Sequence, residues 1–238
     1  MPKAAIKILN SLSVMIIEKY KPVIIGVFDD GKKGEYAMMV KKALEGKFDV
    51  CVSPLIINGN TGIAKAIIDF FFKKSQVQPN MLVLRLGVSQ GAYVKKMLKI
   101  LHPDIVVFGR GNENDEKGMA GAEKSLLFRS LKKNVLAVCD AEDKTLNELA
   151  DKSRCSKMTF GFGTDAMVKG HIFESGGEDE QDSREGGTTF KITYDDSIVP
   201  FHLASRASEE EVRAALAAVA VSLHLGSNMI EISEALRK

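Results

Sequence analysis

The sequence has no tryptophan, only three cysteines and no strong excess of either charge. The cysteines, Cys51, Cys139 and Cys155, are odd in number and widely spaced, without a Cys-x-x-Cys pair, which excludes a disulfide framework and a cysteine-based zinc site. A formal net charge of +2 over 238 residues is too balanced for bulk electrostatic attraction to nucleic acid. We therefore expect a cytoplasmic protein without a nucleic-acid partner.

A long uninterrupted apolar run is also missing. The most apolar stretch near the N-terminus, residues 5–17, is broken by lysine, asparagine and serine and is too short to cross a bilayer. It also lacks the cleavage pattern of a signal peptide. Ile6, Leu9 and Ile16 recur at helical spacing, so we predict that residues 1–18 form an amphipathic helix docked on the rest of the chain. Peripheral contact with a membrane or a partner is the alternative for this helix.

Short apolar runs alternate with amphipathic segments from residue 19 to residue 161. The runs predicted to be strands are 23–28, 50–54, 81–86, 105–108, 135–138 and 158–160. The segments predicted to be helices are 33–44, 61–74, 92–101, 117–131 and 146–152. Apolar strands separated by helices are typical of a parallel sheet that is covered on both faces. We predict an α/β fold with a doubly wound, mostly parallel sheet, and a single domain over residues 19–238.

The pattern changes after Gly161. Segments 169–174, 188–193 and 199–203 predict a small antiparallel β annex near residues 168–203. Between the first two, residues 176–187 (GGEDEQDSREGG) contain only polar residues and glycine, which predicts a solvated, mobile loop rather than a metal site. Ser208 and Glu211 have the spacing of a capping box, so a helix should run from there to about Leu225 and stop at Gly226.

Several segments carry a family resemblance. They are KYKPVIIGV, LVLRLGVSQGAYVKKMLKILHPDIVVFG, AEKSLLFRSL, AVCDAEDKTLNELA, KMTFGFG, TFKITYDDSIVPFHL and ALAAVAVSLHLG. In this order, over residues 19–238, they resemble the central, ATP-binding domain of the Mur ligase family. They look most like the branch that adds D-alanyl-D-alanine to the peptidoglycan precursor. The resemblance implies a P-loop-type fold and an ATP-dependent acid–amino-acid ligase that uses Mg²⁺.

The phosphate loop departs from the family pattern, which reads roughly Thr-Gly-x-x-Gly-Lys-Thr/Ser. Such a loop works because glycines let backbone N–H groups surround the phosphates, while the lysine reaches their oxygens. Here Asp29 and Lys32 stand at the two glycine positions, and Lys33 falls on the family lysine. A carboxylate beside a triphosphate costs on the order of 1 kcal/mol even when it is solvated. We interpret this segment as a vestigial phosphate loop consisting of Gly31, Lys32, Lys33 and Gly34, with Asn58 matching a family asparagine.

Other positions have also lost the residues that bind metal or take part in catalysis in the family. The glutamate that helps to hold Mg²⁺ is Arg85 here, which would repel a cation, so we expect no bound metal. The family Asn-x-Asp-Asp element reads Asp140-Ala141-Glu142-Asp143, and the family histidines before and after it are absent. Lys124 matches the lysine that the family carbamylates. Lys124 and Asp143 are thus vestigial catalytic residues, with Lys124 interpreted as a surface lysine.

The family's N-terminal substrate domain and C-terminal domain are not expected in this chain, because about 20 residues precede the first predicted strand. Other reactive residues lack partners in the sequence. Cys139 is interpreted as a small buried hydrophobe, the three consecutive phenylalanines 70–72 as core or contact residues, and the four histidines as surface or capping residues: His102, His171, His202 and His224.

Three functions remain open. We favour a catalytically degenerate domain that acts as a binding or structural subunit, without a cofactor, and that associates with a protein partner or with itself. The alternative is an ATP-dependent amide ligase for a peptidoglycan precursor, or a half-enzyme completed by a partner chain, with ATP and Mg²⁺ as cofactors. A regulator that binds a nucleotide or another anion without hydrolysing it is the third.

Overall fold

The computed structural model describes residues 3–28, 34–53, 59–73, 80–86, 98, 100–109, 121–172 and 187–238. The helices are α1 (Lys3–Tyr20), α2 (Glu35–Leu44), α3 (Gly59–Lys73), α5 (Gly121–Ser130), α6 (Lys144–Asp151), α7 (Glu209–His224) and α8 (Met229–Arg237). The strands are β1 (Val23–Phe28), β2 (Val50–Val52), β3 (Met81–Arg85), β4 (Ile105–Phe108), β5 (Leu136–Asp140), β6 (Ser156–Gly161), β7 (Val168–Ile172), β8 (Thr188–Tyr194) and β9 (Ser197–Leu203). Within these ranges no helix has the length and apolar character needed to span a membrane.

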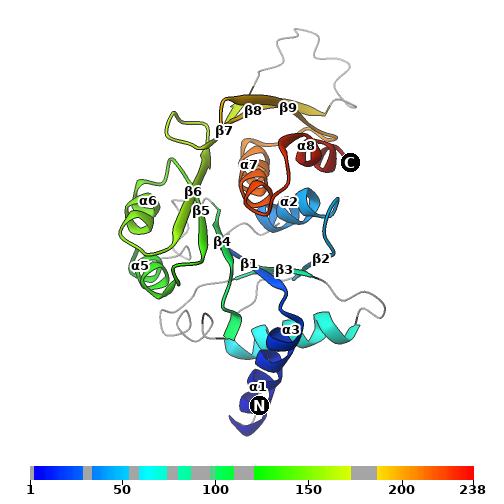
Figure 1. Ribbon diagram of the computed structural model, residues 1–238, viewed down its shortest axis with the longest axis vertical. Coiled ribbons are helices and arrows are strands. Elements are labelled where there is room, and N and C mark those ends of the chain that lie inside the picture. Colours follow the sequence, from blue (N-terminus) through cyan, green and yellow to red (C-terminus); the bar gives the residue numbers. More distant parts are fainter. Residues whose placement is uncertain are drawn as a thin grey trace.

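The described strands form one nine-stranded sheet in the order β2-β3-β1-β4-β5-β6-β7-β8-β9 (Figure 1). Neighbours from β2 to β7 pair in parallel, and the β7–β8 and β8–β9 pairs are antiparallel. The chain leaves β1 toward β2 and β3 on one side and then places β4 on the other side of β1. This reversal of direction is the topological switch of a doubly wound sheet.

Alternate residues of the central strands supply two cores, one on each face of the sheet. Ile25 and Val27 of β1 face one core together with α2, α7 and α8. Ile24 and Phe28 face the other, which is covered by α1, α3, α5 and α6. Figure 1 shows these two helical layers on opposite sides of β1 and β3. The near-continuous apolar strands of the sequence are explained by this double coverage.

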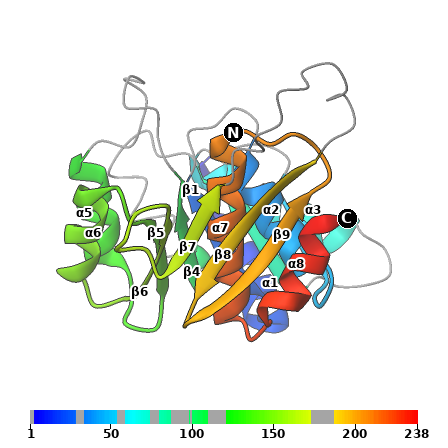
Figure 2. The same ribbon diagram turned by 90° about the horizontal axis from the view of Figure 1, so that it is seen from above.

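Helix α7 lies inside the molecule. Every residue from Val212 to Ser222 is buried, because α2 and α8 flank the helix and strands β5, β6 and β7 pack on it. The antiparallel strands β8 and β9 extend the sheet beyond α7 (Figures 1 and 2). Ser208 and Glu211 form the predicted capping box at the start of α7, and Gly226, at φ +81°, follows the C-terminal end of this helix. A left-handed residue just after a helix is a conformation that glycine adopts without strain.

The predicted fold class is confirmed, and strands β1 and β4 have the predicted bounds. One feature differs: the antiparallel strands are a continuation of the main sheet, because β7 pairs in parallel with β6 through Phe160 and Gly161. Most of the predicted helix 92–101 and the loop 176–187 lie outside the described residues.

Candidate functional site

The carboxyl ends of the parallel strands bring several candidate residues to one edge of the sheet. Phe28 ends β1 and precedes the N-terminus of α2, Arg85 ends β3, and Asp140 ends β5. Ligands of doubly wound proteins bind outside this edge, where the strand order reverses. The candidate site therefore lies above β3, β1, β4 and β5.

Arg85 lies against the N-terminus of α2. Its side chain is 7% exposed, and its backbone N–H donates to the Ser53 hydroxyl at 2.8 Å. Gly34, the residue before α2, is in the left-handed region at φ +69°, and a β-carbon there would overlap the Arg85 guanidinium. Glycine at this position therefore accommodates both the backbone turn and the arginine.

Arg213 of α7 is the buried centre of an ion-pair network at the end of β5. Its guanidinium donates to Asp140 Oδ2 at 2.9 Å, to Glu142 Oε2 at 2.6 Å and to Glu209 Oε1 at 2.9 Å. Arg213 and Asp140 are 4% and 2% exposed, and the Arg213 Cζ lies 4.7 Å from the centre of the Phe162 ring. Burial lowers the pKa of Arg213, but the carboxylates outweigh it and raise that pKa above its usual value.

Glu142 joins this network to the loop after β6. Its Oε1 accepts the backbone N–H groups of Phe162 at 2.8 Å and of Gly163 at 3.0 Å. Burial on its own raises the pKa of Glu142, but these two N–H donors and Arg213 more than compensate, so the pKa lies below its usual value. The carboxylate is thus ionised and fully engaged.

Lys124 and Asp143 form a second pair beside this network. The Lys124 ammonium lies 3.2 Å from Asp143 Oδ2, and the other oxygen of Asp143 caps α6 by accepting the Leu146 N–H at 2.9 Å. Lys124 is 25% exposed, so the lysine that was interpreted as a surface residue is partly buried and paired.

A hydrogen bond connects the N-terminal turns of the two helices at the site. The Tyr36 hydroxyl of α2 donates to Glu210 Oε1 of α7 at 2.7 Å. Glu209, Glu210 and Glu211 fill the first turn of α7 with negative charge. Carboxylates stabilise a helix N-terminus, and they make this one unfavourable for a further anion.

Comparison with solved structures identifies the fold, whereas neither a protein-family model nor a curated protein matches the chain. MurF from Acinetobacter baumannii superposes with a TM-score of 0.76 at 18% identity, over 97% of this chain and 48% of that one. The MurF ligase from Thermotoga maritima, solved in complex with ADP, gives 0.74 at 16% identity over 98% and 53%. A point mutant of L. casei FPGS gives 0.60 at 11% identity over 95% and 66%. The chain has the Mur ligase central-domain fold.

The chain spans about half the length of the MurF structures that it matches. Within the Mur ligase fold, the predicted site residues fall into three groups. Gly34 and Arg85 are in contact, and so are Lys124 and Asp143. Gly31, Lys32, Lys33 and Asn58 lie outside the described residues.

The remaining candidates do not converge on the site. His171 bonds to Thr193 and His202 to Thr189, both at 3.0 Å within the antiparallel strands. Cys139 is fully buried, and burial raises the pKa of its thiol, so it is not a thiolate nucleophile. In the part of the chain that the structure describes, no group of three or more His, Cys, Asp or Glu side chains could hold a metal ion.

Arg213 was missed in the sequence, although a signal was present. It is the one charged residue in the stretch EVRAALAAVAVSLHLG after Glu211, and a charge inside an apolar helix needs a buried partner. Sequence spacing could not identify that partner, because Asp140 is 73 residues away.

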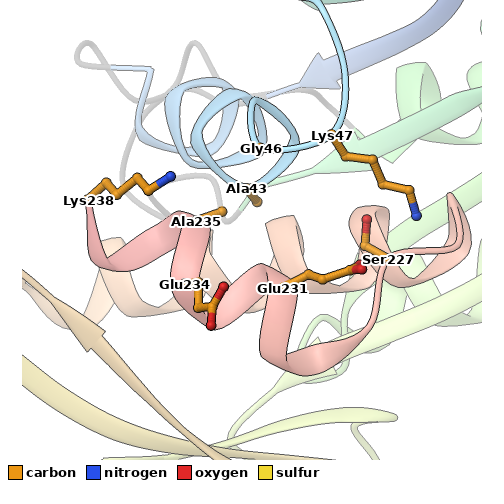
Figure 3. Close-up of a pocket in the computed structure, with 8 residues that line it drawn as sticks. All are labelled: Ala43, Gly46, Lys47, Ser227, Glu231, Glu234, Ala235 and Lys238. Carbon is orange, nitrogen blue, oxygen red and sulfur yellow. The ribbon is translucent and has the colours of Figure 1, made fainter.

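A cavity of about 250 Å³ lies away from the site, between the C-terminal end of α2 and helix α8 (Figure 3). Its walls include Ala43, Gly46 and Ala235, with Lys47 and Glu231 at one side. Gly34 is at the opposite end of α2, which is about 15 Å long at 1.5 Å per residue. The cavity therefore does not extend the candidate site.

Proposed function

We propose that this chain keeps the Mur ligase fold as a binding or structural subunit and does not hydrolyse ATP. The observation that carries this proposal is the buried Arg85 guanidinium at the N-terminus of α2. By resemblance, members of the Mur ligase family have at this strand end a glutamate that helps to hold Mg²⁺. A guanidinium has no lone pair to offer a metal ion, and its positive charge disfavours a cation beside it.

The acidic groups at the end of β5 support the same proposal. Asp140 and Glu142 are engaged by Arg213, and two backbone N–H groups occupy the other oxygen of Glu142. Releasing either carboxylate to a metal would remove one of the three partners of the buried Arg213 guanidinium, which is costly. The network thus serves the packing of α7 on β5 rather than metal binding.

The pairing of Lys124 adds a third argument. Carbamylation would turn the Lys124 side chain into an anion, and that anion would lie beside the Asp143 carboxylate, which is 3.2 Å from the ammonium. The lysine that the family modifies is therefore held as one half of an ion pair in this chain.

The first experiment is a calorimetric titration of the purified chain with ATP up to millimolar concentration, with and without Mg²⁺. We expect no Mg²⁺-dependent heat and no thermal stabilisation. Ligand at 100 times its dissociation constant would stabilise the fold by about 2.7 kcal/mol, which a melting curve detects readily. The proposal fails if the chain turns over ATP with Mg²⁺ and Lys33→Ala abolishes turnover, while the matched control Lys42→Ala leaves it intact.

An ATP-dependent ligase is the second candidate, supported by the likeness to ligase structures and by the juxtaposed Lys124 and Asp143. As a half-enzyme it would need a partner chain that supplies substrate-binding walls and would act on a peptidoglycan precursor. Phosphate release that appears only when a co-purifying protein is present would favour it. Saturable ATP binding without Mg²⁺ and without phosphate release, lost in Arg85→Met, would instead indicate an anion-binding regulator.

A further inference from the structure

Helix α1 has an apolar stripe that faces solvent. Ile8, Leu12 and Met15 are 68%, 37% and 64% exposed, and they recur at i, i+4 and i+7. Among the described residues, seven large apolar side chains are exposed, and three of them are on this one stripe. Scattered exposed apolar residues are common, whereas a contiguous row on a helix is typical of a contact surface.

The opposite face of α1 already has a partner. Ser13 and Ile16 are buried there, and α1 packs on α3, with Tyr20 stacked on Phe71 at 4.8 Å between ring centroids. Figure 1 shows α1 crossing α3, with the N-terminal end of α1 extending away from the sheet. The stripe is therefore additional to the face that docks the helix on the domain.

The charges beside the stripe identify what covers it. Lys7 and Glu18 are both exposed and eleven residues apart. At 100° per residue this separation is three full turns plus about 20°, so the two residues lie on the same edge of the stripe. Among the described residues neither belongs to an ion pair. One edge of α1 thus has a positive charge near its start and a negative charge near its end. When two copies of such a helix pack antiparallel, the positive end of each edge meets the negative end of the other.

We propose that α1 is the contact surface for a second copy of this chain, with the two α1 helices packed antiparallel about a two-fold axis near Leu12. In this arrangement Ile8 packs against Met15 of the partner subunit, and the exposed, small Ser11 allows close approach near the axis. Lys7 then faces Glu18 of the partner subunit, and the symmetry repeats this pair. This inference does not depend on the proposed function.

Two other arrangements fit less well. A parallel pair would place Lys7 and Glu18 of the two chains on opposite edges of the contact, so the Lys7–Glu18 pairs would not form. Insertion into a membrane surface is favoured by the lysines of α1, Lys3, Lys7 and Lys19, but it would bring the exposed Glu18 against anionic headgroups. One helix pair is a small interface, so we expect a dimer that dissociates on dilution.

The test is sedimentation velocity on the full chain over a wide range of concentration. We expect a monomer–dimer equilibrium whose dissociation constant rises at least tenfold in Lys7→Glu and in Glu18→Lys. The double variant should return to within about threefold of the parent, because the pair is restored with its charges exchanged. Ile8→Glu should abolish the dimer, and the matched control Ile230→Glu, at an apolar residue 64% exposed on α8, should leave it unchanged.

Several outcomes would overturn the proposal. A chain that stays monomeric at all concentrations excludes it, as does a dimer that is indifferent to Ile8→Glu. A dimer that both single charge variants weaken and the double variant does not restore would rule out the antiparallel arrangement. Flotation of the monomer with anionic vesicles, without dimer in solution, would assign the stripe to a membrane surface.

Discussion

A buried guanidinium that meets three carboxylates is the most consequential single residue of this molecule. Arg213 is 4% exposed, and its partner Asp140 is 2% exposed. Two charges of this kind add little stability over a well-packed apolar pair, but removing one of them leaves the other buried without that counter-ion. The pair therefore fixes where α7 sits on β5 more than it strengthens the fold.

Arg213→Met should lower the free energy of unfolding by about 3–5 kcal/mol, because Asp140 stays buried without its counter-ion. Urea denaturation followed by circular dichroism measures the change. Arg206→Met, at an exposed arginine, is the control and should change stability by less than about 0.5 kcal/mol. Combining Arg213→Met with Asp140→Asn should recover part of the loss; no recovery would mean that the ion pair is not the cause.

Glu142 makes stability depend on pH in a defined window. Its pKa is lower in the folded chain than in the unfolded chain, so its contribution is complete above the unfolded value and is lost as pH falls through the folded value. The free energy of unfolding should fall below about pH 4.5 less steeply in Glu142→Gln than in the parent. Equal slopes in urea titrations between about pH 5.5 and pH 3 would contradict the assignment.

The residue scale is where sequence reasoning succeeded least. Arg85 stood out because the resemblance expects a glutamate there, and the structure places it beside Gly34. Arg213 had no such expectation, and its partners are brought to it only by the folded sheet. Long-range electrostatic pairing follows from topology, which single-sequence patterns do not determine.

At the scale of elements, α7 combines a strong N-terminal cap with an unsatisfied group in its last turn. Ser208 accepts the Glu211 N–H, and Glu211 in turn accepts the Ser208 N–H at 2.7 Å. The Ser222 hydroxyl is fully buried and has no hydrogen-bond partner among the described residues. The two serines thus act on the stability of one helix with opposite sign.

Ser222→Ala should raise the free energy of unfolding by about 1 kcal/mol, since it removes a buried polar group that makes no bond. Ser208→Ala should lower it by about 1 kcal/mol through loss of the cap. Thermal and urea unfolding of the two variants measure both changes. If Ser222→Ala destabilises the chain by more than about 0.5 kcal/mol, the hydroxyl has a partner after all.

Elements were predicted well where a short apolar run stands between helical segments. Strands β1 and β4 are uniformly apolar because helices cover both faces, and their bounds were read directly from the sequence. The antiparallel strands were predicted from the sequence, but their attachment to β6 was not. That attachment is a pairing of Phe160 with Val168 across a bend, and alternation within a strand carries no information about its neighbour.

At the scale of the whole molecule, one sheet carries both cores, so the two helical layers should unfold together. The sequence has no tryptophan, so a single introduced tryptophan would be the only source of tryptophan fluorescence. Phe128→Trp reports on the core with α3, α5 and α6, and Phe190→Trp on the core with α2, α7 and α8. In each variant the fluorescence and far-ultraviolet transitions in urea should coincide. Separate midpoints would show that the two layers are independent units.

The position of α7 in the chain also has a consequence for synthesis on the ribosome. Strands β1 to β6 and helices α3, α5 and α6 all emerge before residue 209, so one face of the sheet can be covered early. The other face, with Val107 and Val138, has only α2 over part of it until α7 is translated. An incomplete nascent chain therefore exposes an apolar sheet face. Chaperones that shield such surfaces can bind this face until translation has passed His224, the last residue of α7.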